Sequence, residues 1–229
     1  MRALVIQPDP TEKAALVGEA LRERGFDLEP WTIQDDPYTA DGRTTFPDAG
    51  SYDLIVATGS LWSVYDDRIT SWMGPFAALL REAVTDGVPV LGICFGAQAL
   101  AVATGGEVRR NPHPEIGWHR VDSEVDAVAR EWFQWHKDGF TVGPEASLVG
   151  KNDVGQQTFT VGRSLGVQFH PEIDSTHLEY WLAGGGATDM ESDGVDPEAV
   201  LADTRSREVG LYRQVSDLVH WFLEDVAGH

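Results

Sequence analysis

The chain has 229 residues, with 37 acidic and 17 basic side chains and a formal net charge of −20 at pH 7. A surface this acidic repels nucleic acid and anionic membranes, so the composition argues against both as partners. A single cysteine excludes an intramolecular disulfide and a cysteine-rich zinc site. No apolar stretch approaches the length of a membrane span or a signal peptide, and we expect a cytoplasmic protein.

The first 106 residues alternate between apolar runs and stretches of helical periodicity, which is typical of a parallel sheet with right-handed helical crossovers. Asp9 and Glu12 fit the two positions of a capping box, with Pro10 at the first helical position, so the first helix is expected to begin there. The polar stretch 33–50 predicts a surface loop. The expected strands cover residues 2–7, 26–31, 52–58 and 88–93, and the expected helices cover residues 9–24, 71–86 and 96–104.

Beyond residue 106, short apolar and aromatic runs alternate with turns, which predicts several short antiparallel strands up to residue 168. Residues 166–169 predict one further buried strand, and glycines 184–186 are interpreted as a linker between helices. The chain is expected to form one domain over residues 1–229, with a core of residues 1–175 and a helical extension over residues 176–229. The expected C-terminal helices cover residues 175–183, 197–206 and 208–226.

Cys94 stands between the expected strand 88–93 and the helix that follows it. Gly92 and Gly96 flank it two residues away on either side, which is the spacing of a nucleophile elbow with Cys in place of Ser. A lone cysteine in an apolar run is also a common small core residue, and the elbow spacing alone leaves these two interpretations evenly balanced. In an elbow, the N-terminus of the following helix would favour the thiolate form.

His170 and Glu172 follow the expected strand 166–169, with Pro171 between them. Residues two apart on an extended segment point the same way, and Pro171 biases His170 away from a helix, so the imidazole and the carboxylate can form a hydrogen bond. The carboxylate would then hold the ring in one tautomer, as the acid does in a nucleophile–base–acid triad. Since Cys94 and His170 both follow parallel strands, we expect them to meet at one edge of the sheet.

The stretches GICFGAQ (residues 92–98) and GVQFHPE (residues 166–172) resemble the signatures of class I, or triad-type, glutamine amidotransferases. Residues 61–66 and 114–118 resemble the stand-alone members related to the glutaminase domain of GMP synthase. The resemblance implies an α/β fold with a central, mostly parallel, flavodoxin-like sheet and flanking helices. It also implies a small antiparallel sheet and extra C-terminal helices.

The resemblance also implies the chemistry of the site. Cys94 would be the nucleophile that carries a γ-glutamyl thioester, His170 the general base, and Glu172 the acid that orients His170. The N–H of Phe95 would donate one hydrogen bond of an oxyanion hole. The second donor would come from the loop after the strand 52–58, where the family has Gly-Gly-Pro and this chain has Gly59-Ser60-Leu61, so either Gly59 or Ser60 donates.

Three further residues match substrate contacts of the family. Gln98 lies one helical turn past Cys94 and matches a glutamine that touches the substrate. Trp135 and His136 match a strand that binds the backbone of glutamine through main-chain groups. The remaining histidines have no metal-ligand spacing, and we expect neither a metal nor a cofactor.

These features lead us to expect a glutamine amidotransferase-type hydrolase that releases ammonia from glutamine for a separate synthetase. A γ-glutamyl hydrolase or peptidase acting on a larger γ-glutamyl amide is the alternative, and a broad pocket around Trp62, Trp118 and Trp135 would favour it. A non-catalytic binding protein of the same fold is the third hypothesis, and the intact Cys94, His170 and Glu172 argue against it.

Overall fold

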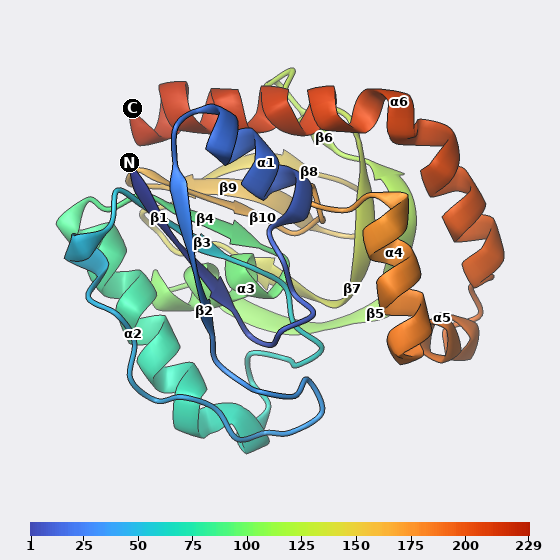
Figure 1. Cartoon of the computed structure of the whole chain (residues 1–229), viewed down its shortest axis with the longest axis horizontal. Coiled ribbons are helices and arrows are strands. Elements are labelled where there is room, and N and C mark those ends of the chain that lie inside the picture. Colours follow the sequence, from blue (N-terminus) through green and yellow to red (C-terminus); the bar gives the residue numbers. More distant parts are fainter.

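The computed structural model describes all 229 residues and contains an eight-stranded sheet with helices on both faces (Figure 1). The strand order is β2-β1-β3-β4-β10-β9-β8-β6. The order of its parallel part is that of flavodoxin-like sheets, and it confirms the predicted mostly parallel architecture. The five parallel strands are β2 (Asp27–Thr32), β1 (Arg2–Gln7), β3 (Leu54–Ala57), β4 (Val90–Ile93) and β10 (Ser164–Val167).

Three antiparallel strands extend this sheet, and two others form a small second sheet. The extension consists of β9 (Gln156–Val161), β8 (Ser147–Lys151) and β6 (Asp122–Ser123), and the second sheet of β5 (Glu107–Arg120) and β7 (Glu131–Thr141). The prediction of only short strands here is wrong for the second sheet, because two separate apolar runs belong to the single strand β7. A register shift between Arg110 and Glu115 absorbs Pro112 and Pro114, which cannot donate ladder hydrogen bonds.

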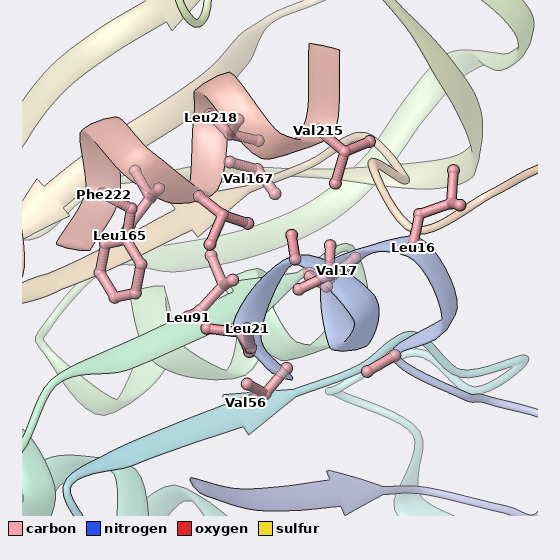
Figure 2. Packing of buried hydrophobic residues seen from close by; sticks show 14 of the residues in the cluster. Leu16, Val17, Leu21, Val56, Leu91, Leu165, Val167, Val215, Leu218 and Phe222 are labelled. Carbon is pink, nitrogen blue, oxygen red and sulfur yellow. The ribbon is translucent and has the colours of Figure 1, made fainter. Parts of the chain in front are cut away.

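Two pairs of helices cover the two faces of the main sheet. The helices α1 (Ala15–Glu23) and α6 (Pro197–Trp221) pack on one face, and α2 (Thr70–Asp86) and α3 (Phe95–Ala103) pack on the other. Each face of the sheet carries a cluster of buried apolar side chains, one under α1 and α6 and one under α2 and α3. Successive residues of the central strands point into one cluster and then the other, so these strands are apolar throughout. Figure 2 shows the first cluster, in which the labelled residues include Val17, Leu21, Val56, Leu91, Val167, Leu218 and Phe222.

The first helix begins later than predicted. It starts at Ala15, and Asp9 instead closes a tight turn by accepting a hydrogen bond from the N–H of Thr11 at 2.8 Å. The carbonyl of Glu12 accepts hydrogen bonds from the side chains of Gln7 (2.8 Å) and Thr58 (3.1 Å). The predicted capping box is therefore wrong, because these contacts hold residues 8–14 as a loop at the carboxyl end of the parallel strands.

The glycine linker predicted at residues 184–186 separates two helices, as expected. The first is α4 (Ser175–Trp181), and the second, α5 (Ala187–Ser192), was not predicted. Gly185 has a φ of +114°, which interrupts the helical path between them.

The two helices predicted over residues 197–206 and 208–226 are one helix, α6, which continues through a π-helical segment, Phe222–Ala227. Its polar middle is stabilised by an ion pair between Asp203 and Arg207 at 2.8 Å, four residues apart. Leu201, Thr204 and Leu211 keep the buried side of the helix continuous across this stretch. None of the helices has both the length and the apolar character needed to cross a membrane.

Candidate active site

Cys94 occupies a strained turn between β4 and α3. Its φ of +50° is one that residues other than glycine rarely adopt, and its N–H donates a hydrogen bond to the carbonyl of Val167 at 2.8 Å. A Cβ on Gly92 would lie 2.8 Å from the carbonyl oxygen of Gly96, and a Cβ on Gly96 would lie 2.1 Å from that of Ala57. The turn therefore has the geometry of a nucleophile elbow, with glycines where no side chain fits.

His170 and Glu172 form a buried pair just after β10. Nδ1 of His170 donates a hydrogen bond to Oε1 of Glu172 at 2.7 Å, and the backbone N–H of His170 donates to the carbonyl of Phe133 at 2.8 Å. The imidazole packs edge-on against Trp181, with ring centroids 5.2 Å apart. Nε2 has no hydrogen-bond partner, and His170 lines the same cavity as Cys94, so this nitrogen is free to exchange a proton there.

The charges around His170 favour its protonated form. Burial lowers the pKa of the imidazole, but the negative charges of Cys94 and Glu172 outweigh burial and raise that pKa well above its ordinary value. The imidazole of His170 can therefore carry a proton at neutral pH, facing the cavity that it shares with Cys94.

Free N–H donors lie at the positions predicted for an oxyanion hole. Phe95 is the first residue of α3, so its N–H has no acceptor within the helix. The N–H groups of Gly59 and Ser60, in the loop after β3, donate to no group of the chain. Ser60 lines the cavity and Gly59 is buried beside it, so both keep a free donor next to the elbow.

Glu12 is a further ionisable side chain of this site, which the sequence analysis placed in a helix cap. A Cβ on Gly59 would lie 2.8 Å from Oε2 of Glu12 and 3.1 Å from Cε1 of His170, so both groups lie against the same glycine. Burial raises the pKa of Glu12 to about 8, helped by the charge of Asp9 and opposed by that of His170. Its place directly after β1, at the carboxyl end of a parallel strand, was the signal that could have identified it.

Gln98 lies against the elbow and is held by hydrogen bonds. Its Nε2 donates to Oε1 of Gln168 at 3.2 Å and to the carbonyl of Asp138 at 3.4 Å, which leaves Oε1 of Gln98 without a partner. Gln168 in turn donates from Nε2 to Sγ of Cys94 at 3.7 Å. Gln168 was not predicted as a site residue, although it stands two residues before His170 and an extended chain therefore directs both to one side.

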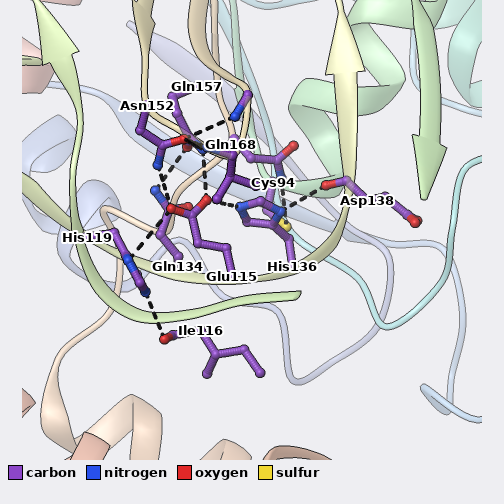
Figure 3. Close-up of polar contacts among 12 residues, drawn as sticks. Cys94, Glu115, Ile116, His119, Gln134, His136, Asp138, Asn152, Gln157 and Gln168 are labelled. Atoms are coloured by element: carbon purple, nitrogen blue, oxygen red, sulfur yellow. Dashed lines mark hydrogen bonds and ion pairs between the residues drawn. The ribbon is translucent and has the colours of Figure 1, made fainter. Parts of the chain in front are cut away.

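His136 belongs to a buried polar network that reaches from β5 to the elbow (Figure 3). Its Nε2 lies 3.0 Å from Oε2 of Glu115, and its Nδ1 lies 2.9 Å from the carbonyl oxygen of Asp138. Burial raises the pKa of Glu115, but the hydrogen bond and charge of His136 lower it on balance. The carboxylate of Glu115 and the carbonyl of Asp138 therefore hold the ring of His136 from its two nitrogens. Asn152 and Gln157 also donate hydrogen bonds to Glu115.

A cavity of about 790 Å³ connects these groups. Of the site residues predicted from the sequence, Glu172 and Gly59 lie behind its wall, and the rest line it: Cys94, His170, Phe95, Ser60, Gln98, Trp135 and His136. Aromatic side chains form much of its outer part: Tyr38, Trp62, Tyr180 and Trp181. A pocket that included Trp118 would have favoured the larger substrate, but Trp118 does not line this cavity. It packs on Phe133 and donates to the hydroxyl of Thr204 at 2.9 Å, since β5 directs it toward α6.

Comparison with known proteins gives one matching family model, glutamine amidotransferase class-I, over residues 14–182. The chain is 31% identical over 215 residues to a GMP synthase [glutamine-hydrolyzing] of Aeropyrum pernix, covering 86% of this chain and 39% of that protein. It is also 31% identical to a protein of Ignicoccus hospitalis that is named as one subunit of GMP synthase [glutamine-hydrolyzing], over 57% of this chain and 72% of that one. The chain thus spans well under half of the first of these relatives.

Solved structures share the fold. A glutamine amidotransferase from Thermotoga maritima matches with a TM-score of 0.84 and 24% identity, covering 98% of both chains. A glutamine amido transferase from Methylobacillus flagellatus matches with a TM-score of 0.82 and 24% identity, over 99% of this chain and 94% of that one. These similarities confirm the predicted sheet, the small antiparallel sheet and the C-terminal helices as one known architecture.

Proposed function

The chain belongs to the class I glutamine amidotransferases and is related to GMP synthase, and on this premise we propose that it hydrolyses the γ-amide of glutamine with a Cys94–His170–Glu172 triad. The observation that carries the proposal is the strained Cys94, which lines the same cavity as His170, the hydrogen-bond partner of Glu172. A non-catalytic protein would have no use for a positive φ at a cysteine or for a buried imidazole with a free nitrogen.

In the proposed reaction, the thiolate of Cys94 attacks the γ-carbonyl carbon of the substrate. The electron pair moves to the carbonyl oxygen, which accepts hydrogen bonds from the N–H of Phe95 and from that of Gly59 or Ser60. Each such donor lowers the activation free energy by on the order of 3 kcal/mol. The imidazolium of His170 gives its Nε2 proton to the departing nitrogen while the carbon–nitrogen bond breaks, and ammonia leaves.

The γ-glutamyl thioester on Cys94 is then hydrolysed. The neutral imidazole of His170 takes a proton from water, whose oxygen attacks the thioester carbon. Glutamate leaves, and the thiolate and imidazolium are restored. Oε1 of Gln98 and the main-chain groups of Trp135 and His136 are the proposed substrate contacts, because they line the cavity beside Cys94.

Replacing Cys94 by alanine tests the triad. Ammonia release from glutamine, measured on the purified protein with and without a candidate synthetase, should fall by about a thousandfold or more in Cys94→Ala. An electrophilic glutamine analogue should label Cys94 of the wild type, as mass spectrometry of the tryptic peptide would show. Gly74→Ala, on the exposed side of α2, is the matched control and should keep both properties. Unchanged release in Cys94→Ala, or an unlabelled wild type, would refute the triad.

A γ-glutamyl amide larger than glutamine is the second candidate substrate, and the size of the cavity favours it. A volume of about 790 Å³ is in the range of pockets that hold drug-sized ligands, and Trp62 and Trp181 could pack on an extended amine part. Turnover of a panel of γ-glutamyl amides without any partner protein would separate the two. Faster release from the larger amides supports this hydrolase, and activity confined to glutamine supports the amidotransferase.

The proposal includes a separate protein that receives the ammonia. Some relatives, including the one from Ignicoccus hospitalis, are named as one subunit of GMP synthase, which suggests a partner synthetase for this chain as well. The proposed catalytic unit is the single domain of residues 1–229, in which residues 1–175 carry the triad and residues 176–229 form the helical extension.

A further inference from the structure

Glu12 has no role in the reaction as described, although its carboxyl faces the cavity. The side chain is 5% exposed, and it forms neither a hydrogen bond nor an ion pair. Its peptide is fixed by the hydrogen bonds from Gln7 and Thr58 to its carbonyl, so the side chain projects from an anchored position. An unpartnered carboxyl that is buried to this degree is costly unless a ligand or a proton satisfies it.

The groups around Glu12 explain its preferred form. Asp9 stands on the same loop, His170 and Glu172 stand after β10, and His177 of α4 approaches the carbonyl of Thr11 at 3.4 Å. No lysine or arginine pairs with it. With two neighbouring carboxylates and its own burial, Glu12 keeps its proton at neutral pH, since its pKa is raised to about 8.

We propose that Glu12 is a further substrate-contacting residue, which holds the reacting γ-amide by a hydrogen bond as a neutral carboxylic acid and stops the reaction when it ionises. The proposal rests on the function proposed for Cys94 and His170. A neutral carboxyl presents both a donor and an acceptor, and its contact with Gly59 places it next to the groups that would surround the carbonyl. An ionised Glu12 would repel the developing oxyanion and would hold the proton on His170.

The test compares three variants over a pH series from about pH 6 to about pH 10. Glu12→Gln keeps the shape, a donor and an acceptor, so its kcat at neutral pH should stay within about threefold of the wild type. Its activity should also persist above the pH at which the wild type declines. Glu12→Ala should lose roughly tenfold or more in kcat at neutral pH. Glu82→Gln, which removes an exposed carboxyl on α2, is the charge-matched control.

Equal activity of Glu12→Ala and the wild type would overturn the proposal, and so would a Glu12→Gln variant with the losses of Glu12→Ala and an unmoved pH profile. Difference infrared spectroscopy supplies a readout that does not depend on turnover. The wild type should show the band of a protonated carboxyl at neutral pH, which titrates near pH 8 and is missing in Glu12→Gln. An absent band overturns the proposal for Glu12, whereas a present band in a protein without Cys94-dependent turnover overturns the proposed function instead.

Discussion

The two carboxyl groups next to the imidazole of His170 differ in their contacts. Glu172 accepts a hydrogen bond from Nδ1 of His170 and compensates its charge, whereas Glu12 has no partner and keeps a proton. The difference follows from contacts: a carboxylate that shares its charge with an imidazolium is stabilised when buried, and one that shares it with nothing is not. The raised pKa values of Glu12 and His170 therefore make the stability of the folded protein depend on pH.

The free energy of unfolding should fall as pH rises through the neutral range. The unfolded chain releases the proton of Glu12 near its ordinary pKa of 4.5, but the folded chain releases it only near 8, so between these values alkali favours unfolding. The raised pKa of His170 acts in the same direction, because its stabilising effect is complete below about pH 6.5 and is lost as pH rises through the folded pKa.

Glu12→Gln should reduce this dependence and be more stable than the wild type at pH 8, by on the order of 4 kcal/mol. Urea denaturation at several pH values measures the slope of the unfolding free energy against pH for the wild type and for Glu12→Gln. Glu82→Gln should follow the wild type. Identical slopes for the wild type and Glu12→Gln would contradict a buried, protonated Glu12.

The elements that carry the site were largely predictable because they are covered on both faces. Continuous apolar runs separated by helical periodicity predicted β1, β3, β4 and β10, and the glycines around Cys94 predicted the elbow. The sequence did not reveal where tertiary contacts override local patterns. Glu12 fits a capping box by spacing, but the hydroxyl of Thr58, just after β3, fixes its peptide outside any helix. Similarly, Glu115 contacts His136 only because β5 pairs with β7.

The continuity of α6 gives a test at the level of elements. Gly210 stands in the middle of this helix, and a Cβ there would meet nothing within 4 Å. Gly210→Ala should therefore stabilise the protein by about 0.5–1 kcal/mol, as alanine does within a helix. Gly96→Ala is the contrasting variant, because its Cβ would lie 2.1 Å from the carbonyl oxygen of Ala57, and it should cost about 1–3 kcal/mol or more. Midpoints of urea denaturation measure both, and a destabilised Gly210→Ala would argue against one continuous helix.

The net charge of the whole molecule affects its stability. A formal net charge of −20 on 229 residues means that the folded surface repels itself, which disfavours the compact state. The acidic excess, with only three lysines, is equally compatible with a salt-adapted host and with a bias in genome composition.

Added salt should stabilise the protein, because it screens this repulsion more strongly than it weakens the few surface ion pairs. Raising the ionic strength from about 0.01 M to about 1 M shortens the screening length roughly tenfold, so the midpoint of thermal unfolding should rise. Potassium chloride and sodium chloride should act alike, since the effect does not depend on a specific ion site. A midpoint that falls with either salt would contradict self-repulsion as a dominant cost.

The place of β10 beside β4 determines when the proposed active site can form during synthesis. Cys94 precedes His170 by 76 residues, and the N–H of Cys94 is held by Val167, so the elbow is completed only after β10 has been translated. At about 5–20 residues per second, the nascent chain spends several seconds with β4 as an open sheet edge and with Cys94 lacking the proposed base His170. A ribosome-bound chain that ends before β10 should therefore release no ammonia from glutamine, and other strands could pair incorrectly with β4.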